Sequence, residues 1–224
     1  MLDIEAKAHN ALRATAGDRG HYSDPVAASR ELSARIAPVV QAARQAARRV
    51  AAQRMQAEVD ALHRDGGPQV HLPRIATPGA ADLIAAERAS RMYGDALLRQ
   101  AQRLLDDADR VSAAELSRGT DGALIDIANT EVPHAFNDER RRIERATKER
   151  YEGTSWYPLM AKMYDATLDR RTCPRCKALD GKWRPLGIDF AGKAQAPMHA
   201  RCRCVVVLII SPLFLGRREA DEAA

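Results

Sequence analysis

The sequence has few aromatic residues, since Phe, Trp and Tyr together make up 4% of its 224 residues. This excludes a thick aromatic core and favours alanine-rich helices that pack along narrow apolar stripes. Long apolar runs are also missing. The most apolar stretch, VVVLIISPLFL at residues 205–215, is about half the length that spans a bilayer. The opening residues MLDIEAKAHN contain acids and no apolar core. We therefore expect a soluble protein, made in a reducing cytosol, with no membrane partner.

Cysteine is scarce, but all four cysteines lie between Cys173 and Cys204. Cys173 and Cys176 are two residues apart, so two sulfurs from one tight turn can converge on a tetrahedral ion. Cys202 and Cys204 share one face of an extended strand, because side chains alternate along it. The clustering predicts a structural metal site. Two disulfides, at a density far below that of a disulfide scaffold, and inert buried thiols are the alternatives.

His199 is a fifth candidate ligand for a site that has about four places. Either the four cysteines bind the ion, or His199 replaces Cys202 or Cys204. The expected cofactor is one structural Zn²⁺. A catalytic zinc would need an open coordination place and a general base, and Asp180 and Asp189 are the only acids in this window.

The net charge of +5 is unevenly distributed. Residues 173–210 contain seven basic residues and two acids, so the rest of the chain sums to zero. A zinc ion held by four thiolates would remove two units of charge from this segment. The metal-loaded segment is then only modestly basic.

The first long helix is predicted after SDP at residues 23–25, which reads as an N-cap followed by proline. Pro38 predicts a kink or a break within it. Apolar residues recur at steps of three and four and predict a packing stripe of Leu32, Ile36, Val39, Ala43, Ala46 and Val50.

Residues 32–57 contain five arginines and no acid. On a helical wheel Arg44 and Arg48 fall opposite the predicted stripe, where a phosphate backbone could be met. The run is either a solvated helix face or a non-specific contact with double-stranded DNA. The candidate DNA-binding residues are Arg44, Arg48 and Arg49 here, and Arg201 and Arg203 among the cysteines.

Residues 65–80 are rich in glycine and proline and are predicted to form a linker or exposed loop. A second helix is expected from Ala81 to about Val111, returning as an antiparallel partner of the first or, alternatively, offering a groove to a partner helix. Its predicted stripe is Leu83, Ala86, Ser90, Tyr93, Leu97, Ala101, Leu104, Ala108 and Val111.

A third helical region is predicted from about Asp121, with a kink or junction near Pro133. Residues 138–150 are crowded with charges of both signs. The default interpretation is an exposed, salt-bridged helix, and DNA contact is the alternative.

The periodicity changes after residue 158, where three short strands are predicted within residues 159–169, 181–186 and 202–210. Such a sheet is too small to fold unaided, so a bound metal would supply the stability that its small apolar core cannot. The expected fold class is mainly α: a long helical hairpin or bundle, then a small metal-stabilised α+β module.

The predicted organisation has five parts. They are an N-terminal helical region (1–64), a linker (65–80), a helical region (81–152), the metal-binding module (153–215) and a frayed tail (216–224). Apolar Leu213, Phe214 and Leu215, beyond the last strand, are the predicted contact with a protein partner.

Residues 165–186, DATLDRRTCPRCKALDGKWRPL, and 196–208, APMHARCRCVVVL, resemble the C-terminal signature of the phage Mu F-like head-morphogenesis, or minor head, proteins. IANTEVPHAFNDERRR, at residues 127–142, is similar to a less specific helical segment of that family. Ala200 stands where the family usually has proline, and Tyr164 where tryptophan is frequent; neither change removes a candidate ligand.

The resemblance implies a non-enzymatic virion protein, made in the host cytoplasm and located at the portal and capsid interior. The portal protein, the major capsid protein and non-specific double-stranded DNA are its implied partners, with a possible homo-oligomer around the portal. Two rivals remain from other classes. A zinc-knuckle nuclease or toxin-like enzyme would need a second catalytic cluster, and a cytosolic DNA-binding regulator would need base-reading residues.

Overall fold

The computed structural model describes residues 2–16, 21–64, 69–75, 77, 79–155, 157–170, 172–190, 196–199 and 201–210. The predicted tail (216–224), the predicted contact residues Leu213, Phe214 and Leu215, and part of the predicted linker (65–80) lie outside these residues. The described chain is mainly helical and contains three antiparallel strands near its C-terminal end, which confirms the predicted fold class.

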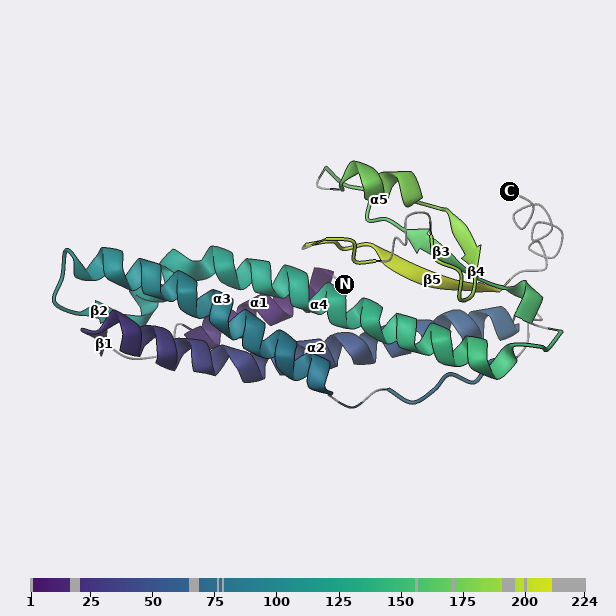
Figure 1. Ribbon diagram of the computed structural model, residues 1–224, viewed down its shortest axis with the longest axis horizontal. Coiled ribbons are helices and arrows are strands. Elements are labelled where there is room, and N and C mark those ends of the chain that lie inside the picture. Colours follow the sequence, from purple (N-terminus) through teal and green to yellow (C-terminus); the bar gives the residue numbers. More distant parts are fainter. Residues whose placement is uncertain are drawn as a thin grey trace. The chain divides into compact units, whose positions relative to one another are not determined.

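The helices in the described residues are α1 (Leu2–Ala16), α2 (Pro25–Arg64), α3 (Ala80–Leu105), α4 (Ala113–Tyr151), the short α5 (Pro174–Leu179) and the 3-10 helix η1 (Tyr157–Leu159) (Figure 1). The strands are β1 (His21–Tyr22), β2 (Val111–Ser112), β3 (Met160–Asp165), β4 (Trp183–Pro185) and β5 (Val205–Ile210). Among these helices, none is long and apolar enough to cross a bilayer.

The chain divides into two compact units: residues 1–47 with 77–132, and residues 48–76 with 133–224. The divisions fall inside α2 and inside α4, and in α4 between Val132 and Pro133. Both helices are nevertheless continuous through Pro38 and Pro133. Of the predicted kink or break at Pro38, the break is therefore not present, and the kink stays a prediction.

In the first unit, α2 and α3 pack as the predicted antiparallel pair. The Ser29 hydroxyl donates to the Gly94 carbonyl (2.8 Å), and the Ser90 hydroxyl donates to the Ser33 carbonyl (2.5 Å). A Cβ atom at Gly94 would lie 3.3 Å from Ser29 Oγ, so a residue without a side chain lets the two helices approach closely. The two-residue strands β1 and β2 pair antiparallel, His21 with Ser112 and Tyr22 with Val111.

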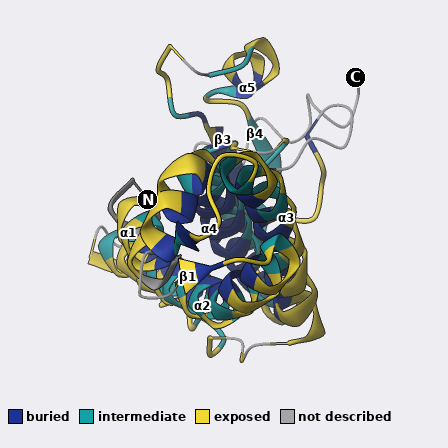
Figure 2. Ribbon diagram, turned by 90° about the vertical axis from the view of Figure 1, so that its left-hand side faces the viewer, coloured by how far each residue is buried: buried dark blue, intermediate teal, exposed yellow. Residues whose placement is uncertain are grey.

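The buried stripe of α2 differs from the prediction by one position. It begins as predicted at Leu32 and Ile36 and continues through Val40, Ala47, Ala51, Met55 and Val59. Because alanine occupies so many positions of this helix, small side chains are present on more than one of its faces, and the sequence pattern alone does not fix which face is buried. The adopted stripe turns Arg44 and Arg48 inward, and both are buried. Figure 2 shows the buried positions of the helices in dark blue.

The predicted stripe of α3 is partly correct. Ala86, Tyr93, Leu97 and Ala101 are buried, whereas Leu83 is 58% exposed. α3 ends at Leu105, and Asp82 takes an inward position.

Arg44 joins α2 to α3 and α4 in the first unit. Its guanidinium is 3% exposed and donates to Asp82 Oδ1 (2.8 Å) and Glu131 Oε2 (2.6 Å), both also buried. Arg88 pairs with the second oxygen of Glu131. A buried guanidinium needs such charged partners, because an unpaired charge in the interior is strongly unfavourable. The predicted exposed position of Arg44 is therefore wrong.

In the second unit, β3 is the central strand, and the order is β4-β3-β5. Met163 pairs with Trp183 of β4 and with Val207 of β5. An apolar cluster packs one end of the sheet against the last part of α2 and the second half of α4. Its buried members are Met55, Val59, Val70, Ile143, Met160, Leu186 and Leu208.

We expect Arg44→Ala to lower the free energy of unfolding by about 3–5 kcal/mol, because it leaves two buried carboxylates without their common partner. The matched control is Arg91→Ala on α3. Arg91 is 70% exposed, and its ion pair with Glu87 is correspondingly weak, so this change should cost about 0.5 kcal/mol or less. Urea denaturation followed by circular dichroism measures both; equal losses would show that the Arg44 network does not stabilise the fold.

Candidate metal centre

Cys173 and Cys176 are placed by the start of α5. Cys173 is the N-cap residue, with extended backbone (φ −68°, ψ 156°), and Pro174 occupies the first turn. Proline is favoured there because its fixed φ suits the helix and its missing N–H would have no partner. The Cys176 N–H donates to Cys173 Sγ at 3.4 Å. The C-P-x-C sequence thus folds into a turn that brings both sulfurs to one side.

His199 and Cys202 reach the same place from the loop before β5. The Cys202 N–H donates to the His199 carbonyl at 3.1 Å, which closes a turn. Arg201, inside this turn, has a φ of 60°, in the left-handed region that side chains other than glycine rarely adopt. This turn brings His199 Nε2 and Cys202 Sγ close to the same sulfur, that of Cys176.

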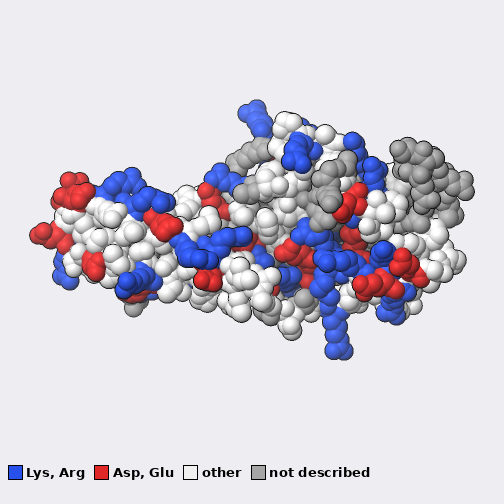
Figure 3. Space-filling model, viewed as in Figure 1, with Lys and Arg blue, Asp and Glu red and all other residues white. Residues whose placement is uncertain are grey.

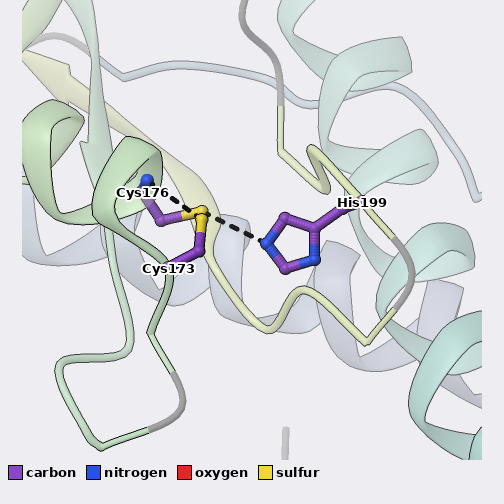
Figure 4. A group of neighbouring side chains, drawn as sticks. All are labelled: Cys173, Cys176 and His199. Atoms are coloured by element: carbon purple, nitrogen blue, oxygen red, sulfur yellow. Dashed lines mark hydrogen bonds between the residues drawn. The ribbon is translucent and has the colours of Figure 1, made fainter.

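All five predicted ligands surround one small cavity of about 10 Å³. Their atoms form two triads, Cys173–Cys176–His199 and Cys176–Cys202–Cys204, and the ligand atoms within each triad lie within 4.8 Å of one another. Cys176 belongs to both. Figure 4 shows the first triad, with the sulfur of Cys176 facing the imidazole ring of His199.

The spacing of these atoms fits a tetrahedral ion. Cys176 Sγ lies 3.8 Å from Cys202 Sγ and 3.8 Å from His199 Nε2. With metal–sulfur bonds of about 2.3 Å, the edge between two sulfurs of a tetrahedron is about 3.8 Å. A disulfide requires about 2.05 Å between sulfurs, and all four cysteines are free thiols here. The cluster can therefore hold a metal ion.

The thiols differ in how readily they lose a proton. A hydrogen bond with the Cys204 thiol lowers the pKa of Cys202 to about 4. The same hydrogen bond is the main cause that raises the pKa of Cys204, and burial of the thiol raises it further. The Cys176 N–H lowers the pKa of Cys173, whereas burial raises the pKa of Cys176 to about 11. A cation would favour the remaining thiolates, because only thiolates bind a metal well.

The cysteines also form the core of the module. Cys176, Cys202 and Cys204 are buried together with Tyr164, Leu179, Phe190 and two alanines. The Tyr164 ring meets Phe190 edge to face, with 5.6 Å between ring centroids. Its hydroxyl lies 3.5 Å from Cys176 Sγ, so the tyrosine borders the candidate ligands directly.

The sequence LDG, residues 179–181, follows the second cysteine and forms the turn after α5. Leu179 is buried, and Asp180 Oδ1 accepts the Ala166 N–H at 2.8 Å. Gly181 has a φ of 70°, a conformation that favours glycine. Its N–H donates to the Tyr164 carbonyl at 2.9 Å. The turn after α5 is thereby joined to the end of β3.

The charged stretch of α4 is only partly the exposed helix that we predicted, since Arg145, Glu149 and Arg150 are exposed but other charges are not. Glu139, Arg140 and Glu144 are buried. Arg140 donates to both oxygens of Glu58 (3.0 and 2.7 Å) and, through Nε, to the Val206 carbonyl (2.5 Å). Glu144 Oε1 accepts from Lys162 Nζ of β3 at 2.8 Å. The charges are buried because they pair with the sheet and with α2.

Two further donors link α4 to the cysteine segment. Asn137 donates to the Cys204 carbonyl at 3.0 Å, and Arg141 donates to the Ala196 carbonyl. Sequence reasoning missed both, as a single asparagine in a charged helix carries no pattern that distinguishes a buried donor from a solvated one.

The structure separates the candidate DNA-binding residues into two groups. Arg48 is 7% exposed and pairs with the fully buried Glu139 (3.5 Å), so its predicted exposed position is wrong, like that of Arg44. Arg49 and Arg201 are exposed. The Arg203 side chain is largely buried and paired with Asp169. DNA contact by these residues stays a prediction, and burial argues against Arg44 and Arg48.

Other basic residues of the module are exposed. Arg175 and Lys177 project from α5, and Figure 3 shows Lys and Arg side chains around that helix.

Comparison with known proteins identifies the segment that contains this cluster. Residues 123–207 match the family described as "Phage Mu protein F like protein". No curated protein and no solved structure matches the chain. The matched residues include the second half of α4, β3, β4, the first three residues of β5 and all five candidate ligands. The match confirms the resemblance predicted from the sequence: the segment that carries the cysteine–histidine cluster is similar to the family described as "Phage Mu protein F like protein".

Proposed function

We propose that this protein is a minor head protein of a tailed phage that serves head morphogenesis, with a C-terminal module folded around one structural zinc ion. The match of residues 123–207 carries this proposal. The five convergent ligands support the metal, because a three-stranded sheet of this size needs a further source of stability. The role is structural rather than enzymatic.

The proposed location is the virion, at the portal and capsid interior, where the portal protein and the major capsid protein are the partners and several copies can surround the portal. Double-stranded DNA packaged in the head is the proposed further ligand. Contact with DNA would use exposed basic residues, Arg49 and Arg201 among them, and would be independent of base sequence.

Association with the particle is the direct test of the head role. In purified virions we expect the protein at a fixed number of copies per portal ring, quantified by mass spectrometry against the major capsid protein. A non-structural cytoplasmic protein of the same host, measured in the same samples, controls for carry-over. Complete loss of the protein on further particle purification would contradict the proposal.

Metal content tests the zinc site. Elemental analysis of freshly reduced protein should give about one zinc per chain. Cys176→Ser should abolish binding, because Cys176 is common to both triads. His199→Ala should weaken binding if the imidazole is a ligand, whereas the control His63→Ala, at an exposed histidine of α2, should not. Metal-free wild-type protein that is fully folded would refute the structural role of zinc.

Salt dependence tests the DNA contact. Each phosphate contact contributes about 0.9 to the slope of log affinity against log salt concentration, through counterion release. Replacing Arg49 and Arg201 by glutamine should therefore reduce the slope by up to about two units, with no change in sequence preference. The control replaces exposed Arg91 and Arg99 of α3 in the same way. Equal slopes for wild type and the Arg49/Arg201 variant would remove these residues from the contact.

A further inference from the structure

The outer edge of β5 is covered by side chains of α4. Tyr164 directs both its N–H and its C=O to the β4 side, where they bond with Lys182 (2.8 Å) and Gly181 (2.9 Å). Val206 lies opposite Tyr164, so its carbonyl faces away from β3. This carbonyl accepts from Arg140, and the Cys204 carbonyl, two residues earlier on the same edge, accepts from Asn137. Asn137 and Arg140 are three residues apart and therefore lie on one face of α4. Their donors reach two carbonyls that are two residues apart, which is the spacing of groups along one edge of a strand.

Asn137 is specialised as a donor. Its side chain is 1% exposed, and Nδ2 donates both to the Pro133 carbonyl and to the Cys204 carbonyl at 3.0 Å. Its Oδ1 has no hydrogen-bond partner among the described residues. A flipped amide, or an aspartate, would set an oxygen against two carbonyl oxygens in a buried place. The site therefore requires the two N–H groups.

The backbone on both sides of Cys204 is held from outside the cluster. The Thr167 hydroxyl donates to the Arg203 carbonyl at 3.1 Å, which fixes the peptide before Cys204. Asn137 fixes the peptide after it. The direction of the Cys204 side chain follows from these two peptide planes. Cys204 lies next to Cys202 and Cys176 in the buried triad.

We propose that Asn137 is a positioning residue of the metal centre: by holding the Cys204 carbonyl, it sets the geometry of the Cys202–Cys204 ligand pair. This inference rests on the proposed metal binding. Ligands must be held within about 0.5 Å of productive geometry, and loss of an outer hydrogen bond that orients a ligand typically lowers metal affinity 10–100-fold. By linkage, metal binding in turn strengthens the attachment of β5 to α4.

The test compares Asn137→Ser with Asn137→Ala and a control, Tyr157→Phe. Serine can still bond to the Pro133 carbonyl one turn back but is too short to reach Cys204, so it isolates the bond that matters. Tyr157→Phe also removes a hydrogen bond to a backbone carbonyl in this unit, that of Leu186 (3.1 Å), away from the cysteines. Zinc affinity is measured by chelator competition, and ligand geometry by the absorption of the cobalt-substituted protein.

We expect Asn137→Ser to lower zinc affinity 10–100-fold and to change the cobalt spectrum at saturation, whereas Tyr157→Phe leaves both unchanged. Asn137→Ala should behave like serine, and excess zinc should restore folding if either variant is unfolded without metal. Wild-type affinity and spectrum in Asn137→Ser would overturn the inference and leave the residue a packing element only. Absence of zinc binding in the wild type would instead refute the proposed metal site.

Discussion

The second unit depends on one buried guanidinium. Arg140 is 3% exposed and binds both oxygens of Glu58, the Val206 carbonyl and, at 5.8 Å, the face of Phe136. A planar group with five donors can satisfy a carboxylate and a strand edge at once, which a lysine cannot. The last part of α2, the middle of α4 and β5 are thereby joined at one side chain. Its partner Glu58, in α2, lies outside the residues that match the family. The matched segment therefore forms this ion pair with a residue of an earlier helix.

The cysteine module shows how a small sheet is stabilised from two sides. On one side, three buried cysteines pack in a core with Tyr164 and Phe190, and the cysteines also line a cavity of about 10 Å³. On the other, polar side chains of α4 bond to its backbone and pair with Lys162. An unpaired strand edge would otherwise expose free carbonyls and N–H groups. The candidate metal ligands and the donors of α4 meet at Cys204, whose sulfur belongs to the cluster and whose carbonyl accepts a hydrogen bond from Asn137.

Buried ion pairs take the place of aromatic packing elsewhere in the chain. Arg44 with Asp82 and Glu131, and Arg48 with Glu139, occupy positions where most helices carry apolar side chains. Alanine-rich faces slide past one another at little cost, because neighbouring stripes are nearly equivalent. A buried pair tolerates only one alignment, since any other leaves a charge unpaired. These pairs therefore set how α2 aligns with its neighbours.

The sequence alone determined the cluster and its surroundings. The C-x-x-C turn, the presence of three strands and the resemblance of residues 165–186 and 196–208 follow from local pattern, because a tight turn directs both sulfurs without reference to the rest of the chain. The predicted strand through Cys202 and Cys204 is wrong, since β5 begins only at Val205 and Cys202 lies in a turn before it. The face that α2 buries, the burial of Arg44, Arg48 and Arg140, and the hydrogen bonds of Asn137 depended on tertiary packing. Local periodicity predicted exposed positions for these arginines, because their carboxylate partners lie far away in the sequence. Only long-range contacts bring those partners close enough to compensate a buried charge.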